Sequence, residues 1–521
     1  MSSHAANGAA AAIDAIAAHL ASGEIEVAEQ LARAALEASP GEPYYWGALG
    51  ETLVRRGELE KAIECFRRAL DLAPGWAEMS NNLAALECRC GKGEAALQVL
   101  QGAIRLHPGF APTQINYARV LVQLGRAEES LAAWDRAIAS QPDRADTHYE
   151  KGNVLRASLR AREALACFEE AARLQPDWNL PRHNLAEACL RLGDSARAIR
   201  NFRRAIALAP GFHPSHGALG VALLQEGQFA EGWREFEWRF GANGATPPRQ
   251  GTSAPVWDGR LLPEDALVVW MEQGLGDMLQ FSRFLPLAAR RGARILLQAP
   301  PQLAGLLRTI DGVAEVFTGD APGADYAWQV PLMSLPGKLG VRRDDVPGPI
   351  PYLHLPNAAA RPRDAFRVGI VWAGSQSNPE FRERDCGFAG MARIATVAGT
   401  AVYSFQFGER VRDLDATSSH QVRRLPADLG DFASTALLAM DMDLIVTVDS
   451  AMAHLIGALG RPVWTLLPEP ADWRWMHGCE DSPWYPTMRL FRQTSPGDWE
   501  DVIDRVCAAL AVEVRQTTPA P

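Results

Sequence analysis

The sequence predicts a multidomain chain of α plus α/β architecture, in which an all-helical array precedes two smaller units of alternating strands and helices. Two observations predict it. Small, bulky and proline positions recur every 34 residues up to residue 210, and beyond residue 255 short apolar runs alternate with helical stretches. A length of 521 residues fits this organisation, because a domain holds roughly 100 to 200 residues.

The period of the array is marked by prolines at Pro40, Pro74, Pro108, Pro142, Pro176 and Pro210. Small residues stand five and twelve positions before each proline, and a mostly bulky residue stands eight positions before it. The small residues let two helices approach closely, the bulky residue fills the gap between neighbouring repeats, and proline ends the second helix. Glycine makes the turn inside each repeat except at Leu159. These glycines are Gly23, Gly57, Gly91, Gly125, Gly193 and Gly227.

This pattern resembles the tetratricopeptide repeat. The resemblance implies a solenoid over residues 7–240, with six repeats through Pro210 and a divergent seventh, 211–240, that caps the array. Such solenoids present a concave surface to a peptide or protein. We therefore expect a protein partner on the repeats.

Asn82, Asn116 and Asn184 share one repeat position. Ile115 and Tyr117 flank one of them, which indicates that the amide lies on the inner face of a first helix. An asparagine can donate to a peptide carbonyl and accept from a peptide N–H. These three residues are our candidates for binding the acceptor, by resemblance to the asparagine ladder of the eukaryotic O-linked N-acetylglucosamine transferase. The alternative is that asparagine is simply frequent at this position.

A Gly/Pro/Ser/Thr-rich segment, 241–256, predicts a linker, and a Pro/Ala/Arg-rich break separates two lobes, 257–355 and 366–512. The alternation of strands and helices predicts a parallel, Rossmann-like sheet in each lobe, and two such lobes suggest a GT-B architecture. Ligands of such folds lie at the carboxyl ends of the strands. The expected strands are Leu267–Met271, Arg294–Gln298, Glu315–Thr318, Tyr326–Val330, Arg367–Trp372, Ala401–Gln406, Leu444–Val448 and Pro462–Leu467.

The first candidate site is the segment EQGLGD, which directly follows the strand expected at Leu267–Met271. Gly274 and Gly276 permit close backbone approach to a ligand, and a helix follows them. Asp277 could take a proton from an acceptor hydroxyl. The alternative is that Asp277 only caps this helix.

The second candidate site follows the apolar strand Leu444–Val448 and opens a helix. Ser450 and the helix amides could hold a phosphate, and Asp449 could accept from a ribose hydroxyl. His454 lies one helical turn onward, on the same face as Ser450. A polar set that interrupts an apolar strand and helix favours a binding site over a structural role.

The segments GDMLQFSRFLP and VDSAMAHLIGALGRP resemble the catalytic-base and nucleotide-sugar motifs of bacterial heptosyltransferases. EGWREFEWRF, TLLPEPADWRW and SPWYPTMRLFRQ resemble bacterial tetratricopeptide-repeat glycosyltransferases with a heptosyltransferase-like GT-B half. The resemblance makes Asp277 the base and places Asp449, Ser450 and His454 at the donor site.

The same resemblance places the donor diphosphate or sugar near Gly374, Arg382 and Arg384. Arginine suits phosphate because its planar fork can bond to it twice. The alternative is a solvated charge run. Relatives commonly show an Arg-Ser pair here, whereas this chain has Asp385 and Cys386 after Arg384, and a carboxylate beside a phosphate would repel it.

Two further features have structural interpretations. The motif at 441–443 resembles the DxD metal signature of the other large glycosyltransferase fold, but it precedes a strand, at the wrong end for a ligand site. We expect no metal. The tryptophans at 464, 473, 475 and 484 could cover a base or sugar, although packing between domains is the simpler explanation.

Composition excludes some functions. A net charge of -10 argues against nucleic acid as a partner, and no apolar run reaches the roughly 20 residues that span a bilayer, so we expect a cytoplasmic chain.

We expect an inverting, metal-independent glycosyltransferase that moves a sugar from a nucleotide-diphosphate donor, its co-substrate, to an acceptor hydroxyl. No other cofactor is expected. The acceptor would be a protein recruited by the repeats, with a flagellin-type protein as one candidate. The alternatives are a lipid-linked or surface-polysaccharide glycosyltransferase and a catalytically inactive repeat scaffold.

Overall fold

The computed structural model describes residues 2–241, 254–320, 326–346, 348–355, 365–374, 383–416, 421–425 and 431–517. The chain forms two compact units, Met1–Leu192 and Gly193–Pro521. Most of the expected linker, 241–256, and the candidate Arg382 lie outside the described residues.

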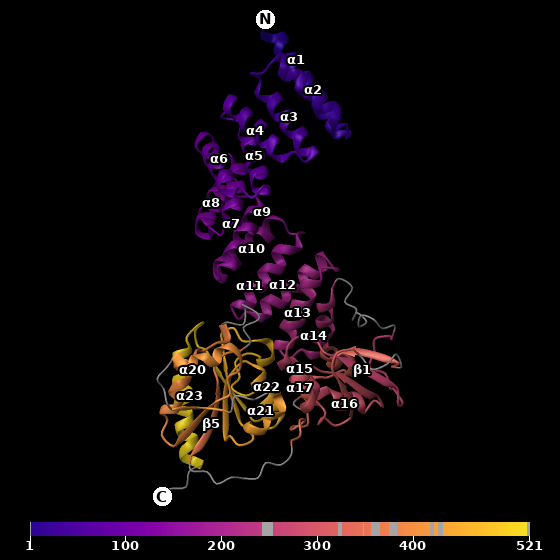
Figure 1. Ribbon diagram of the computed structural model, residues 1–521, viewed down its shortest axis with the longest axis vertical. Coiled ribbons are helices and arrows are strands. Elements are labelled where there is room, and N and C mark those ends of the chain that lie inside the picture. The colour runs from indigo at the N-terminus through magenta and orange to yellow at the C-terminus, as the bar shows by residue number, and fades with distance from the viewer. Residues whose placement is uncertain are drawn as a thin grey trace. The chain divides into compact units, whose positions relative to one another are not determined.

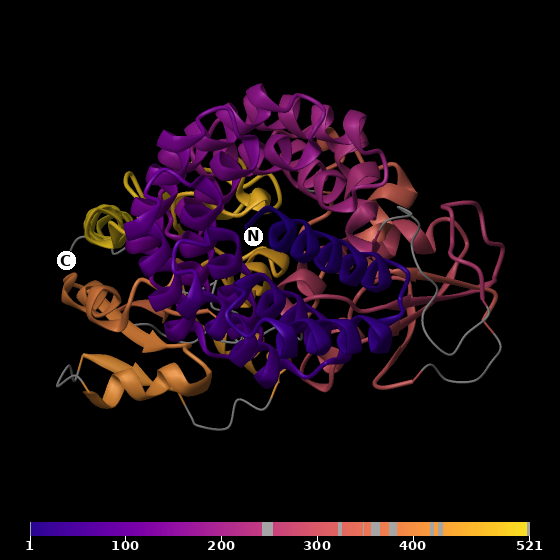
Figure 2. The ribbon, with the colours of Figure 1, turned by 90° about the horizontal axis from the view of Figure 1, so that it is seen from above.

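The first unit consists of helices that follow one another as pairs (Figure 1). Seen from above, the pairs follow a curved path (Figure 2). The helical repeats expected from the sequence are confirmed. The helices are α1 (Ser2–Ala21), α2 (Ile25–Ala38), α3 (Pro43–Arg56), α4 (Leu59–Leu72), α5 (Ala77–Arg89), α6 (Gly93–Leu106), α7 (Ala111–Gln123), α8 (Ala127–Ser140), α9 (Ala145–Ala157), α10 (Ala161–Leu174) and α11 (Asn179–Arg191).

The turn inside each pair needs a residue in the left-handed region. Gly57 has φ 80°, which glycine adopts without steric cost. Leu159 adopts the same conformation, with φ 61°, and its side chain is exposed. The repeat that lacks glycine therefore keeps the turn at the cost of backbone strain.

In two repeats the bulky residue packs inside its own helix pair. A Cβ atom on Gly50 would lie 2.4 Å from the ring of Phe66, and one on Gly152 would lie 2.6 Å from that of Phe168. We expected this residue to fill the gap between neighbouring repeats. At Phe66 and Phe168 the glycines correct that expectation, because they make room for the ring between the two helices of one repeat.

The second unit begins with three more helices of the array and continues with helices that alternate with strands. The array helices are α12 (Ser195–Leu208), α13 (His213–Gln225) and α14 (Phe229–Phe236), followed by the short helix η1 (Glu237–Phe240). The later α-helices are α15 (Leu275–Phe281), α16 (Leu285–Ala289), α17 (Pro301–Leu307), α18 (Leu335–Leu339), α19 (Phe388–Ala392), α20 (Asp413–Ala416), α21 (Phe432–Ala439), α22 (Ala451–Ala458) and α23 (Trp499–Thr517).

The strands of this unit form two parallel sheets. The first has the order β3-β2-β1-β4 and the second has the order β10-β9-β8-β5-β6-β7. The strands of the first sheet are β1 (Ala266–Trp270), β2 (Arg294–Gln298), β3 (Val313–Phe317) and β4 (Trp328–Pro331). Those of the second are β5 (Phe366–Val371), β6 (Thr400–Ser404), β7 (Val422–Arg424), β8 (Leu444–Val448), β9 (Val463–Leu467) and β10 (Met488–Arg492). Every expected strand is confirmed to within two residues at each end.

Strand order reverses direction once in each sheet. In the first sheet the chain runs from β1 through β2 to β3 and then returns to β4 on the other side of β1. In the second it runs from β5 through β6 to β7 and returns to β8 on the other side of β5. Loops that leave such a switch point diverge and create the crevice in which parallel sheets bind ligands.

The end of the array packs into the sheets of its own unit. Trp233 lies edge-on to Trp473, with ring centroids 5.8 Å apart, and Phe229 stacks on Trp484 at 5.6 Å. The Arg239 guanidinium lies 4.0 Å from the Phe240 ring centroid and bonds to a loop of the first sheet. The aromatic residues before the expected linker are therefore core of the second unit.

Candidate functional site

The loop after β1 places Asp277 in the first turn of α15. Its Oδ2 accepts from the Gly274 N–H at 3.0 Å, which is the capping arrangement that the sequence left open. Its Oδ1 is bonded to the guanidinium of Arg474, which follows β9 of the second sheet. Asp277 therefore caps its helix with one oxygen and reaches the other sheet with the second.

The loop after β8 begins with Asp449, which is buried, and continues with Ser450 at the N-cap of α22. The Ser450 hydroxyl accepts from the Met452 N–H at 3.3 Å and lies 2.9 Å from the Thr447 hydroxyl. His454 lies one turn later, where its Nδ1 is 3.0 Å from the Tyr485 hydroxyl. These residues lie close together, as the sequence predicted. However, the Ser450 hydroxyl caps α22, and His454 is almost fully buried.

Gly374 and Arg384 lie next to Asp449. A Cβ atom on Gly374 would lie 3.6 Å from the Asp449 carbonyl oxygen, because the loops after β5 and β8 meet at the switch point. Arg384 Nη1 is 3.0 Å from Asp449 Oδ2. Asp385, whose charge argued against a phosphate here, accepts from the Gly374 N–H at 3.0 Å. Its carboxylate thus holds the loop in place.

Arg474 and Asp472 join these candidates into one charged row: Asp277, Arg474, Asp472, Arg384 and Asp449. Arg474 Nη1 donates to Asp472 Oδ1 at 2.9 Å, and Arg384 Nη2 donates to Asp472 Oδ2 at 3.4 Å. Acids and bases alternate along it, and its two ends belong to loops of different sheets. The sequence did not predict Arg474 or Asp472, although both stand in a loop that directly follows a strand.

Burial and neighbouring charges shift the pKa values of Asp449, Asp472 and His454. Burial raises the pKa of Asp449 despite the nearby Arg384. Burial also opposes ionisation of Asp472, but Arg474 and Arg384 outweigh it and lower its pKa. For His454, burial and the positive charges of Arg474 and Arg283 lower the pKa to about 3. His454 is therefore a neutral group at neutral pH.

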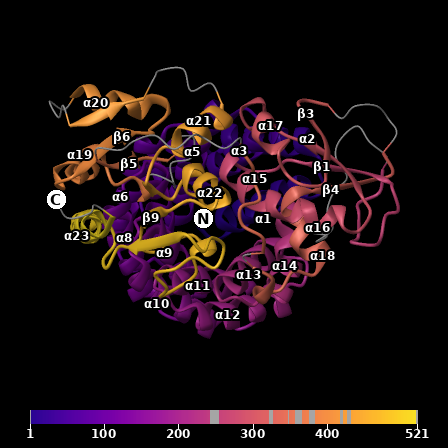
Figure 3. The same ribbon diagram turned by 90° about the horizontal axis from the view of Figure 1, so that it is seen from below.

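Close packing of α15 on α22 holds the two loops together (Figure 3). A Cβ atom on Gly276 would lie 3.1 Å from His454 Cδ2 and 3.4 Å from the Ala451 Cα. Gly276, expected to let a ligand approach, is thus needed for the contact between these helices. The His454 ring in turn stacks on Trp475, with centroids 5.2 Å apart and planes at 16°.

Glu272 and Gln406 are two further loop residues that the sequence did not single out. Glu272 receives two bonds from Arg239, at 3.0 and 2.8 Å, and one from the Met333 N–H at 3.0 Å, which joins the loops after β1 and β4. Gln406 Oε1 accepts from the N–H groups of Trp372 and Ala373, both at 3.0 Å, and so fixes the end of β5. Each is a polar residue just beyond a strand, which is the signal that could have identified them.

The DxD motif directly precedes β8, and both of its carboxylates bind a neighbouring strand. Asp441 forms an ion pair with the Arg367 side chain, and Asp443 accepts from the Arg367 N–H at 2.8 Å. Both lie where β5 and β8 begin, at the edge opposite to the charged row. In the part of the chain that the structure describes, no three His, Cys, Asp or Glu side chains gather as a metal site would require.

The tryptophans of the late strands and loops pack as core. Trp475 and Trp484 are fully buried, and Trp473 and Trp464 are nearly so. The Trp484 Nε1 donates to the Arg474 carbonyl at 2.6 Å. Packing, the simpler of the two explanations, accounts for their positions.

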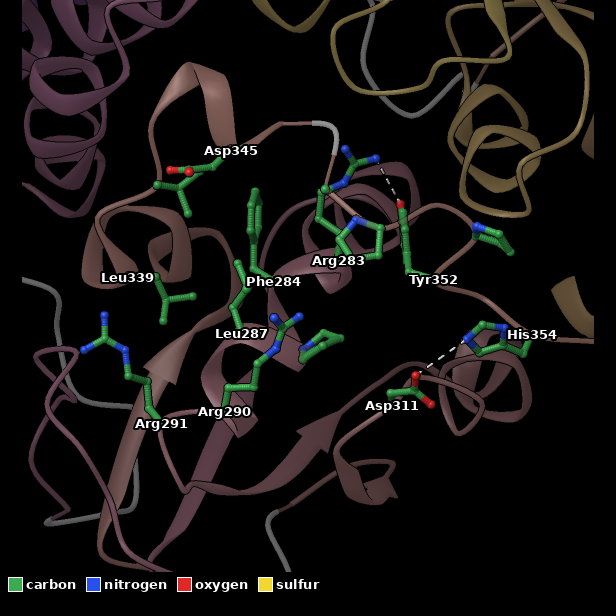
Figure 4. A pocket seen from close by; sticks show the side chains of 15 residues that line it. Arg283, Phe284, Leu287, Arg290, Arg291, Asp311, Leu339, Asp345, Tyr352 and His354 are labelled. Atoms are coloured by element: carbon green, nitrogen blue, oxygen red, sulfur yellow. Dashed lines mark hydrogen bonds and ion pairs between the residues drawn. The ribbon is translucent and has the colours of Figure 1, made fainter.

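A cavity of about 520 Å³ lies in the first-sheet region (Figure 4). Arg283, Arg290, Tyr352 and His354 are among the residues that line it, and none of the candidate site residues does. The Arg283 guanidinium turns towards Tyr352 and donates to the Trp484 carbonyl at 2.8 Å. The charged row, at both switch points, is the better candidate for chemistry.

The three asparagines of the array are not equivalent in the structure. Asn82 is exposed, Asn116 is half-buried, and Asn184 is buried and donates to Asn153 Oδ1 at 2.8 Å. Glu150 occupies the same repeat position between the last two. The amide of Asn184 is therefore engaged within the array.

Two family models described as tetratricopeptide repeat match the chain, one at residues 13–77, 48–111 and 183–232 and the other at 91–151. The N-terminal part of the chain therefore carries tetratricopeptide repeats, which typically bind other proteins. No helix among the described residues has the length and apolar character needed to cross a membrane.

Protein FlbA of Caulobacter vibrioides is 26% identical over an alignment of 316 residues that covers 54% of this chain and 52% of FlbA. The chain thus spans about half the length of this curated relative. Among solved structures, MamA of Desulfovibrio magneticus aligns with 33% of this chain and 96% of its own, at 16% identity and TM-score 0.30. PilF of Pseudomonas aeruginosa aligns with 39% of this chain and 93% of its own, at 20% identity and TM-score 0.34.

Proposed function

We propose that the chain is an inverting, metal-independent glycosyltransferase of GT-B architecture that acts on a protein recruited by its repeats. One observation carries the proposal. Asp277 and Asp449 lie on loops at the switch points of two different parallel sheets, and a single charged row connects them. Ligands of parallel sheets bind at such positions.

Asp277 is the proposed base. It removes the proton from the acceptor hydroxyl, whose oxygen attacks the anomeric carbon while the bond to the nucleoside diphosphate breaks on the opposite face. The donor lies at the second sheet, beside Gly374, Arg384, Asp449, Ser450 and His454. The leaving diphosphate takes Arg384 as a partner in place of Asp449 and Asp472, because a guanidinium bonds well to phosphate.

Turnover by the Asp277→Asn variant tests this assignment. Asparagine keeps the size of the side chain but cannot accept the proton, so sugar transfer should be lost while the donor still binds. Serine or threonine in a co-purifying protein, including a flagellin-type protein, is the acceptor to examine by mass spectrometry. Undiminished transfer by the variant would refute the role of Asp277.

If the full chain captures no specific protein but transfers sugar to a purified lipid-linked or surface saccharide, the acceptor is a saccharide and the repeats serve assembly. The proposed chemistry at Asp277 is the same in both cases.

A catalytically inactive scaffold is the second candidate, and one observation favours it. Every charged member of the row lies in an ion pair with another member, so its charges are balanced without a ligand. A scaffold would bind its partner protein through the repeats and no nucleotide sugar. Calorimetric titration with UDP, GDP, CMP and ADP sugars separates the two, since a scaffold gives no heat with any of them.

A further inference from the structure

We propose that Arg474 is the positioning residue of the base: it orients Asp277 and ties it to the donor-side loop. This inference rests on the glycosyltransferase function proposed above.

All three nitrogens of the Arg474 guanidinium form side-chain hydrogen bonds. Nε donates to Gln280 Oε1 at 2.8 Å, Nη2 bonds to Asp277 Oδ1, and Nη1 donates to Asp472 Oδ1 at 2.9 Å. Gln280 and Asp277 belong to α15 of the first-sheet region, whereas Asp472 belongs to the second. Arg474 is only 8% exposed, so these bonds form out of contact with bulk water.

The result for Asp277 is a carboxylate fixed at both oxygens. Gly274 holds Oδ2 through its N–H, and Arg474 holds Oδ1. A carboxylate offers about four acceptor sites, so two bonds leave it able to take a proton. About a fifth of the side chain stays exposed, which keeps it accessible to an acceptor hydroxyl.

The other edge of Arg474 leads to the donor side. Asp472 bonds to Arg474 through Oδ1 and to Arg384 through Oδ2, and Arg384 pairs with Asp449. A shift of Arg384 towards a diphosphate would therefore break its bond to Asp472 and change the bond between Asp472 and Arg474. Asp277 is thus held relative to the donor as well as to its own helix.

Only arginine can fill this position. Its planar fork bonds three acceptors in different directions, whereas the ammonium of lysine is a point charge without a fixed plane. The main chain of Arg474 is also anchored, because its N–H donates to Asp472 Oδ1 at 3.1 Å and its carbonyl accepts from Trp484. Because the main chain is held, a substituted side chain cannot regain the lost bonds through a shift of the backbone.

A double-mutant cycle on the full chain tests the inference. The variants are Arg474→Gln, Asp277→Asn and the two together, with Arg367→Gln and Asp441→Asn as a matched ion pair at the opposite edge of the second sheet. Hydrogen exchange gives the opening equilibrium of α15. Arg474→Gln should raise its opening constant at least about tenfold more in the native background than in Asp277→Asn. Equal increases would overturn the inference whatever the function.

Turnover supplies the second readout. Arg474→Gln should lower kcat by about 100-fold, with the affinity for the nucleoside diphosphate within about threefold, because it misplaces the base rather than the donor. Arg474→Lys should recover less than a tenth of the native kcat, and Arg367→Gln should leave kcat close to native. A large loss of nucleotide affinity with unchanged kcat would overturn the positioning role.

The two proposals fail differently. If the native chain transfers sugar and the cycle is additive, only the inference about Arg474 falls. If the native chain neither binds a nucleotide sugar nor transfers one, the proposed function falls and the positioning role falls with it.

Discussion

His454 provides a pH-dependent stability that can be calculated from its surroundings. The ring is 4% exposed, is stacked on Trp475 and lies close to Arg474 and Arg283. Burial and these two charges lower its pKa from 6.5 to about 3 in the folded chain. The Tyr485 hydroxyl can donate to its neutral Nδ1, since burial raises the pKa of Tyr485 well above its ordinary value.

The sign of the effect follows from where the proton binds. Below pH 6.5 the unfolded chain takes up a proton at this histidine and the folded chain does not, so stability is full above pH 6.5 and falls towards pH 3. Each pH unit in this window costs about 1.4 kcal/mol, which amounts to roughly 3 kcal/mol between pH 6.5 and pH 4.5.

The assay compares the native chain with His454→Gln, which cannot titrate. Hydrogen exchange of peptides over 444–458, corrected for intrinsic rates, gives the free energy of opening from pH 7 to pH 4.5. Carboxylates titrate equally in both chains, so the difference between the two pH profiles isolates His454. Parallel profiles would refute the assignment of a buried, neutral histidine.

Three further predictions concern a backbone conformation, a contact between two helices and an ion pair. Leu159→Gly should raise the stability of the first unit by about 1 kcal/mol in chemical unfolding, because it relieves a left-handed leucine, whereas Leu159→Ala should give no gain. Gly276→Ala should cost about 1 to 2 kcal/mol in the opening of α15 and α22, since its Cβ meets His454, and Gly374→Ala, whose nearest contact is an ordinary 3.6 Å, should be tolerated; equal costs would contradict the packing role. Glu272→Gln should cost about 2 kcal/mol, because the largely buried Arg239 keeps Glu237 but loses its second carboxylate partner; a change within about 0.5 kcal/mol, the range of surface sites, would show that this pair is dispensable.

The helical array could be predicted almost completely from the sequence. The 34-residue period fixes which helix contacts the next, and the contacts it needs are local in the chain. The packing of Phe66 against Gly50 could not be assigned to its helix pair from spacing alone, because a bulky residue fits equally well between repeats.

The sheets could be predicted less fully. Central strands are apolar runs, but β7 is three residues long with two exposed arginines, and β10, at the opposite edge of the sheet, has two arginines among its five residues. Neither shows the continuous apolar run of a buried parallel strand.

The candidate site divides in the same way. Asp277, Asp449 and Ser450 could be found because each follows a strand and opens a helix. Arg474 could not be assigned a partner, because 197 residues separate it from Asp277 and only the tertiary fold brings them together. Gly276 was expected to face a ligand for the same reason: the sequence does not show that α22 packs against it.

Calorimetric titration of the full chain with nucleotide sugars tests the central claim most directly. We predict that one of the UDP, GDP, CMP and ADP sugars binds at a single site and that Arg384→Gln weakens this binding at least about tenfold. The control Arg393→Gln, at an exposed ion pair with Asp504, should bind as the native chain does. Absence of binding by all four classes, or binding that Arg384→Gln leaves unchanged, would contradict a donor site at the charged row.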